Sequence, residues 1–316
     1  MGLPLEVLVE ILVLLEWKDI LRIRQARLYF TQIYFFMRIF HQTCQRLRDA
    51  SFSRPIWLSL VRWHSATIQP RPFFPEKPLY LYTDRELEYL ILKWQSGKAG
   101  RTLTQPRKLA LSIPEDYLQS VHLIQGGRWL VFGARDGSVK YHDLNSRDET
   151  SEAVTLVPSH FDQDANTIVL LSVDMDLDAE YTTFNLGVMS WRVPPLDGDP
   201  DYPKPPRYTR WIEVSRVTSY WDDSGQVKGL RSERLACFRE QYLCGCDSFT
   251  LGGRHVAYSL YSFEPSPSEG EGENLAIVDW TLADSTSLTY PRRLIWRRRV
   301  RVSCLCLSIR LARVES

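Results

Sequence analysis

The hydrophobic pattern is strongest near the N-terminus, where the stretch from Leu5 to Leu15 carries only two polar residues, Glu6 and Glu10. These glutamates are four residues apart, so in a helix they share one narrow stripe and leave apolar side chains on the remaining surface. Pro4 favours a helix that begins here, because a proline in the first turn loses no intrahelical hydrogen bond. A helix that is apolar on nearly all sides must be covered on several of them. We therefore expect one face to pack in a small helical unit and the other to bind a partner protein.

Three further helical patterns follow, and an atypical segment separates them. After a turn at residues 16–19, Asp19 is suited to cap a helix over residues 20–25. Helices are also predicted over residues 43–51 and 54–62. Between the second and third helices, residues 26–42 hold six aromatic side chains and no acidic one, without a helical stripe. We place an all-α domain at residues 1–62 with this insert inside it.

Residues 63–105 have the composition of a connector. Four prolines in residues 69–78 exclude a regular helix or a central strand. Thr83 and Glu86 then have the spacing of a capping box in front of an amphipathic helix, and Gly97 is suited to end that helix. We predict a Pro-rich linker followed by one helix.

From residue 106 to residue 316, short runs of β-branched and aromatic residues predict an all-β domain. Its clearest hairpin has Asp136–Gly137 as the turn signal. The expected strand pairs are 127–133 with 138–144, 167–173 with 181–191, and 253–261 with 274–280. The chain as a whole is predicted to be an α+β multidomain protein.

Three segments of the β region have unusual compositions. Residues 194–206 contain six prolines, and residues 264–274 are acidic and poor in apolar side chains, so both are predicted to be exposed loops. Residues 291–316 carry eight arginines and one acid. This tail either binds nucleic acid or a nuclear import receptor, or begins as a strand at Ile295.

Composition restricts the class of protein. Hydrophobic residues make up 44% of the chain and charged residues 24%, as in ordinary folded proteins. The net charge of +1 gives no overall attraction to nucleic acids or membranes, with the basic stretch 292–301 as a weak exception. Six cysteines without an N-glycosylation site indicate reduced thiols, so we expect a cytoplasmic or nuclear protein.

Sequence motifs for catalysis or metal binding are incomplete. Asp174, Asp176 and Asp178 have the spacing of a calcium loop, but Ala179 stands where such a loop needs glycine, so a turn is expected there. Cys244-x-Cys246 and Cys304-x-Cys306 lack the C-x-x-C spacing of zinc ribbons. No nucleophile elbow, phosphate loop or dinucleotide fingerprint is present. We therefore expect no catalytic residues, no metal and no cofactor.

The apolar residues of the first domain recur in a recognisable order. They are Leu3-Pro4-x-Glu6, Ile11-Leu12, Leu15, Trp17-x-Asp19-Ile20-Leu21, Cys44-Gln45-Arg46-Leu47-Arg48 and Ile56-Trp57. This order resembles the F-box, a helical module that docks on the Skp adaptor of cullin-RING ubiquitin ligases. The resemblance covers residues 3–25 and 43–60, less than a fifth of the chain.

The resemblance implies a substrate-recognition adaptor that binds Skp, and a cullin through it, in ubiquitin-dependent protein degradation. The residues it implies for Skp binding are Leu3, Pro4, Leu5, Glu6, Leu8, Ile11, Leu12, Leu15, Leu21, Leu47 and Trp57, of which the last three close the module's own core. The hairpin around Gly127 and Trp129 is similar to part of a WD-like propeller blade. A β domain that is degenerate and propeller-like is then expected to capture a protein substrate.

Residues 26–42 depart from the F-box pattern, because the family runs directly from a segment like 23–25 into one like 43–46. Two explanations remain open: an added aromatic loop, which costs little closure entropy, or a translated, unspliced intron, since 17 codons keep the reading frame. A retained intron would disable the F-box. A protein-interaction scaffold outside any ligase, and an enzyme that uses the β domain, also remain open.

Overall fold

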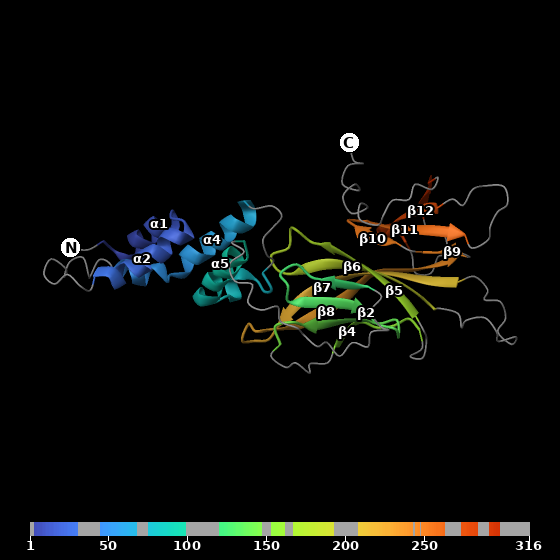
Figure 1. The fold of residues 1–316 in the computed structure, drawn as a ribbon, viewed down its shortest axis with the longest axis horizontal. Helices are drawn as coiled ribbons and strands as arrows, with labels where there is room; N and C mark the ends of the chain where they lie inside the picture. Colours follow the sequence, from blue (N-terminus) through green and yellow to red (C-terminus); the bar gives the residue numbers. More distant parts are fainter. Residues whose placement is uncertain are drawn as a thin grey trace. The chain divides into compact units, whose positions relative to one another are not determined.

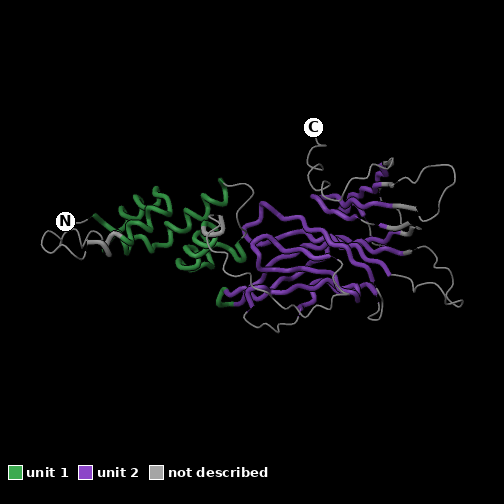
Figure 2. The backbone as a smooth tube through the Cα atoms, in the orientation of Figure 1, with its two compact units in different colours: residues 1–108, 223–225 green, residues 109–222, 226–316 purple. Residues whose placement is uncertain are grey.

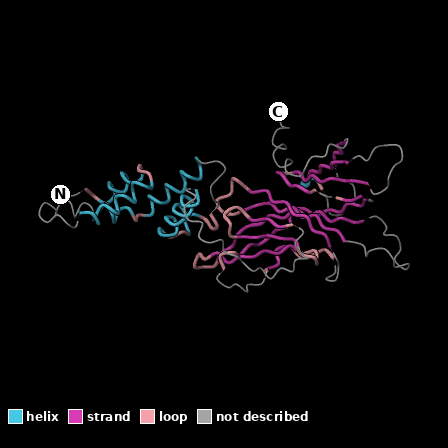
Figure 3. The backbone as a smooth tube through the Cα atoms, viewed as in Figure 1, coloured by secondary structure: helices cyan, strands magenta, loops and turns pink. Residues whose placement is uncertain are grey.

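The computed structural model describes residues 3–30, 45–67, 75–98, 120–146, 153–161, 167–192, 208–242, 244–246, 248–262, 273–283 and 291–297. Helices occupy its N-terminal part and antiparallel strands its C-terminal part, so the chain is a mixed α+β protein (Figure 1). The residues divide into two compact units, 1–108 with 223–225 and 109–222 with 226–316 (Figure 2). The first unit is helical, and the second is built mainly from strands, with the 3-10 helix η3 (Trp280–Leu282) after β12 (Figure 3).

The helical unit contains the helices that the apolar pattern predicts. They are α1 (Leu5–Val13), α2 (Trp17–Phe30), a helical segment at residues 45–51, α4 (Arg54–Thr67), the 3-10 helix η1 (Leu79–Leu81) and α5 (Asp84–Lys98). Pro4 is the N-cap residue of α1. All helices expected from periodicity are therefore present among the described residues.

Several predicted helix ends are wrong, among them that of α4, which continues past residue 62 to Thr67. α2 begins at Trp17, so Asp19 does not cap it but lies in its first turn, where its charge favours the helix dipole and pairs with Arg22 at 2.8 Å. α2 also continues to Phe30, into the segment expected to interrupt the helical pattern, while residues 31–42 lie outside the described part. α5 extends to Lys98 and includes Gly97, which was predicted to end it.

The core of the helical unit draws on every one of its long helices. Its fully buried apolar side chains are Leu12, Ile20, Ala50, Ile56, Trp57, Val61, Leu87 and Ile91. The last two belong to α5, which lies in the region predicted as linker and helix, 63–105, and packs against α4. This helix is thus part of the same hydrophobic core as the segments that resemble the F-box.

Arg24 joins the two segments that flank the insert. Its guanidinium donates to the carbonyl and to the hydroxyl oxygen of Ser51, both at 2.7 Å, and pairs with Glu88 of α5. It also lies over the ring of Phe52, 3.8 Å from the centroid. Charge-assisted hydrogen bonds of this kind are about twice as strong as neutral ones. The second helix and residues 45–51 therefore meet in spite of the insert between them.

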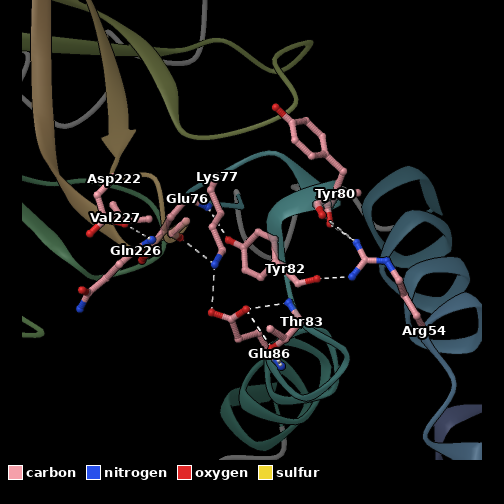
Figure 4. A network of polar contacts seen from close by, with 12 residues as sticks. Arg54, Glu76, Lys77, Tyr80, Tyr82, Thr83, Glu86, Asp222, Gln226 and Val227 are labelled. Atoms are coloured by element: carbon pink, nitrogen blue, oxygen red, sulfur yellow. Dashed lines mark hydrogen bonds and ion pairs between the residues drawn. The ribbon is translucent and has the colours of Figure 1, made fainter.

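The predicted capping box begins α5 (Figure 4). The Thr83 N–H donates to Glu86 Oε2 at 2.7 Å, and the Glu86 N–H donates back to Thr83 Oγ1 at 3.3 Å. Lys77 donates to Glu86 Oε1 at 3.0 Å and to the carbonyl of Gly225, a residue of the same unit, at 2.9 Å. The two bonds between Thr83 and Glu86 satisfy backbone donors that the start of a helix otherwise leaves free.

The start of α4 is held to η1 by Arg54. Its guanidinium donates to three backbone carbonyl oxygens, those of Leu79 at 2.9 Å, Tyr80 at 3.1 Å, and Tyr82 (Figure 4). The chain between α4 and α5 is thereby anchored to the helix that contributes Trp57 to the core.

The described residues of the β unit form three antiparallel sheets in which strands follow their order along the chain. The first sheet has β1 (Val121–Leu123), β2 (Trp129–Gly133), β3 (Val139–Asp143) and β4 (Val154–Val157). The second has β5 (Thr167–Met175), β6 (Thr183–Arg192), β7 (Tyr208–Trp221) and β8 (Val227–Tyr242). The third has β10 (Phe249–Gly252), β11 (His255–Ser262), β12 (Glu273–Asp279) and β13 (Arg292–Arg297), and β9 (Cys244–Gly245) pairs with β11.

All three expected strand pairs are confirmed, as β2–β3, β5–β6 and β11–β12. The turn of the first pair contains Gly137 with φ of +86°, a conformation that glycine adopts without strain. The turn after Asp176 is confirmed as well, since Asp176 accepts a hydrogen bond from the Asp178 N–H at 3.1 Å and pairs with Arg216 at 2.6 Å. Cys304 and Cys306 lie outside the described residues.

The longest hairpin, β7–β8, has no counterpart in the prediction. Two boundaries also differ: residues 273–274, expected in a loop, begin β12, and β13 begins at Arg292 rather than at Ile295. Residues 194–206 of the other expected loop lie outside the described part.

The second sheet packs between the other two. One core contains Trp129 and Tyr141 of the first sheet with Phe184 of the second, and the other contains Phe238 of the second with Tyr258 of the third. Polar bonds also link the first strands of the sheets. His122 Nε2 donates to the carbonyl of Leu171 at 3.0 Å, and the Leu251 N–H donates to Ser172 Oγ at 2.9 Å. β5 therefore lies beside both β1 and β10.

Candidate functional site

α1 has one face in the core of the helical unit and one face without cover. Leu8 and Leu12 point into the core, with exposed fractions of 6% and 0%. Val7, Ile11 and Leu14 are exposed, Leu14 by 86% and Ile11 by 46%. Val7 and Ile11 belong to α1 and Leu14 is its C-cap residue, so their spacing of four and then three residues places them on one side of the helix. We call this face, together with Leu3 and Leu5, which are also exposed, the α1 stripe.

The residues expected to bind Skp separate into three groups by burial. Leu3, Pro4, Leu5, Glu6 and Ile11 are exposed; Leu15, Leu21 and Leu47 are partly buried; Leu8, Leu12 and Trp57 are buried. Leu8 and Leu12 were expected on the docking patch, and the structure instead places them in the unit's own core. Val7 and Leu14 were not among the expected residues, although their helical spacing from Ile11 already indicated them.

Trp57 lies in the core, as expected. Its exposed fraction is 0%, and its Nε1–H donates to the carbonyl of Ser51 at 3.0 Å. Leu21 and Leu47, the other two residues expected to close the core, pack against the same cluster. The N-terminal end of the α1 stripe is positioned by Arg46, which donates to the carbonyl of Leu3 at 3.2 Å.

Within the described part of the chain, no helix is both long and apolar enough to cross a membrane.

A second candidate site, which sequence motifs did not indicate, is a group of polar side chains in the β unit. It consists of His160 after β4, Glu213 on β7 and Cys237 on β8. His160 Nε2 is 2.7 Å from Glu213 Oε2 and 3.8 Å from Cys237 Sγ. Glu213 and Cys237 are paired across β7 and β8, although their separation in sequence matches no known motif. Only the register of β7 and β8 brings them together.

The surroundings of His160 and Glu213 favour the charged form of both side chains. Hydrogen bonds to the Cys237 sulfur and the Glu213 carboxylate raise the pKa of His160 to about 9. Burial raises the pKa of the Glu213 carboxyl, but hydrogen bonds from His160 and Ser215 and the nearby charge of Arg234 outweigh burial and lower it below its ordinary value. At neutral pH, the two residues therefore form an imidazolium–carboxylate pair.

Comparison of the chain with known protein families, with curated proteins and with solved structures gave no match in any of the three searches.

Proposed function

We propose that this chain is the substrate-recognition adaptor of a Skp–cullin–F-box ubiquitin ligase, with the α1 stripe as the surface that docks on Skp. The observation that carries the proposal is the uncovered face of α1. Val7, Ile11 and Leu14 are exposed, while Leu8 and Leu12 fix the opposite face of the same helix in the core. An apolar helix face with anchors at i, i+4 and i+7 is the form in which helices bind hydrophobic grooves.

The burial pattern of the F-box-like residues supports this assignment. Leu12, Ile20 and Trp57 share one core, although residues 26–42 interrupt the motif in sequence. Arg24 and Ser51 hold the flanking segments together. In this proposal, Leu8 and Leu12 present the stripe rather than contact the partner.

The β unit is proposed to be propeller-like and to capture the protein substrate. Support comes from the sequential antiparallel order of its sheets and from the adjacency of β1, β5 and β10, the first strands of each four-strand path. Neighbouring blades of a propeller have this arrangement around a central axis. The WD-like hairpin predicted from sequence corresponds to β2–β3.

In this proposal, the chain itself makes and breaks no bond. It contributes proximity, by holding a substrate close to catalytic subunits that bind elsewhere on the ligase. The work would take place in the cytoplasm or nucleus, with protein partners and without a membrane or nucleic acid.

A paired pull-down tests the proposal, with immobilised Skp adaptor and two forms of the chain, full-length and lacking residues 26–42. Retention of both forms supports the ligase adaptor with an added loop. Retention of the shortened form alone supports a docking site that the insert disables. Retention of neither form rejects ligase membership and favours the scaffold outside any ligase.

A further inference from the structure

His160, Glu213 and Cys237 offer three different donor atoms at one place in the β unit. Their Nε2, carboxylate oxygen and Sγ atoms all lie within 4.8 Å of one another. Glu213 and Cys237 are buried, with exposed fractions of 3% and 8%, and the His160 side chain is 16% exposed. Donors from three separate segments thus meet in a largely buried space.

The geometry argues against a nucleophilic triad. In a Cys–His–acid triad, the thiol and the carboxylate bind opposite nitrogens of the imidazole. One nitrogen then activates the thiol, while the carboxylate at the other nitrogen orients the ring. Here the Cys237 sulfur and the Glu213 oxygen both approach Nε2 of His160, at 3.8 Å and 2.7 Å. Three donor atoms that face one another are the arrangement that surrounds a single cation.

We infer that His160, Glu213 and Cys237 form a zinc-binding site. Imidazole nitrogen, thiolate sulfur and carboxylate oxygen are the three donor types that Zn²⁺ accepts in tetrahedral coordination. A mixed set of soft sulfur and harder oxygen donors is unsuited to Ca²⁺ or Mg²⁺, which select oxygen. Three protein donors leave the fourth position for water or for a side chain of a bound protein.

The surroundings orient the donors. Ser215 donates to Glu213 Oε1 at 2.9 Å and so leaves Oε2 to face His160 and Cys237. The His160 ring stacks on Trp211 with centroids 4.5 Å apart, and Arg239 covers Trp211 at 3.9 Å. Hydrogen-bonded, packed ligands of this kind are typical of metal sites.

Arg234 also lies beside Glu213 Oε2, with its Nε 3.3 Å away. Its side chain is 51% exposed, so it can turn toward solvent when the metal enters. When Zn²⁺ binds, two protons leave to solvent, one from Nε2 of His160 and one from the thiol of Cys237. The total charge of the group is unchanged.

The test is metal titration of the full-length, reduced and chelator-treated protein with Zn²⁺ by calorimetry and with Co²⁺ by absorption. We expect saturable binding and a thiolate-to-cobalt charge-transfer band. Cys237→Ser should abolish the band, and Glu213→Gln, which removes a ligand, should weaken Zn²⁺ binding at least as much as the loss of a group that orients a ligand, about 10- to 100-fold.

Cys246→Ser is the matched control, because Cys246 is also a buried cysteine of the β unit but lies outside the group. It should keep both the band and the affinity. Circular dichroism verifies that each variant is folded, and the nearly isosteric Glu213→Gln provides the test if Cys237→Ser does not fold.

Absence of saturable binding by the wild type, or a band that survives Cys237→Ser, would overturn the inference. Either result leaves the Skp proposal untouched, since the two sites share no residue.

Discussion

Trp57 shows how much of the helical unit depends on one side chain. It fills the core and also satisfies the Ser51 carbonyl at the end of residues 45–51. We expect Trp57→Ala to lower the free energy of unfolding of this unit by about 3–5 kcal/mol, as for other large core truncations. Urea unfolding followed by helical circular dichroism measures this change.

Trp63→Ala is the control on the same helix, because Trp63 is 56% exposed. Its effect should stay within about 0.5 kcal/mol, as at other surface positions. Equal losses for both tryptophans would contradict the assignment of Trp57 to the core.

Glu86 gives the capping box a pH dependence with a defined sign. Burial raises the pKa of Glu86, but the hydrogen bonds from Thr83 and Lys77 outweigh it and lower the pKa below its ordinary value of 4.5. Such a carboxylate stabilises the folded state above pH 4.5, and this contribution is lost as the pH falls through the folded-state pKa. We expect the Tm of Glu86→Gln to fall below that of the wild type at neutral pH, and the difference to disappear in acid.

Thermal unfolding of both proteins across the acidic range checks this expectation. A Tm difference that stays constant with pH would show that the Glu86 charge does not contribute.

Residue-level predictions succeeded where the interaction is local. Thr83 and Glu86 are three positions apart, so sequence alone places them at one helix end. His160, Glu213 and Cys237 are brought together by the pairing of β7 with β8 and by the chain after β4. No spacing in the sequence indicates that these three residues lie close together. The expectation of no metal was based on sequence motifs alone.

At the scale of elements, the β2–β3 hairpin depends on the backbone conformation of Gly137. Its φ is +86°, and an added Cβ would lie 2.6 Å from Ser159 Oγ. We expect Gly137→Ala to destabilise the β unit by about 1–3 kcal/mol, the usual cost of a strained backbone position. Urea unfolding followed by tryptophan fluorescence measures it.

Gly252→Ala is the matched control, because no heavy atom lies within 4 Å of the Cβ it would add. Its effect should stay within about 0.5 kcal/mol. A larger loss for Gly252→Ala than for Gly137→Ala would contradict the hairpin geometry.

The β7–β8 hairpin escaped prediction because buried charged residues break its apolar alternation. Arg210 and Glu213 on β7 and Glu240 on β8 are each at most 3% exposed. Arg210 and Glu240 are direct cross-strand partners, so the pairing that accommodates them is invisible in either strand alone. In α2 the helix was predicted too short, because residues 26–30 have no helical stripe and yet continue the helix to Phe30.

At the scale of the whole molecule, the change from helical to strand patterns predicted a mixed α+β chain, and the structure has that composition. The prediction of which α1 residues face the core and which face a partner was wrong for Leu8 and Leu12. A sequence that is apolar all round does not tell which residues face the core, and only the packing against α4 assigns Leu8 and Leu12 to it. The α1 stripe is what that packing leaves uncovered.

The central claim is that the α1 stripe binds Skp, and calorimetric titration of Skp adaptor into the purified full-length chain tests it most directly. The double variant Ile11→Glu with Leu14→Glu places charges on the stripe and leaves the core unchanged. Leu282→Glu is the control, because Leu282 is equally apolar and 62% exposed but lies in the β unit. We predict binding by the wild type and by the control, and a loss of at least about 100-fold for the double variant, since anchor residues at interfaces carry about 2 kcal/mol or more each. Wild-type binding that the double variant retains in full, or no binding by either the wild type or the chain lacking residues 26–42, would contradict the account.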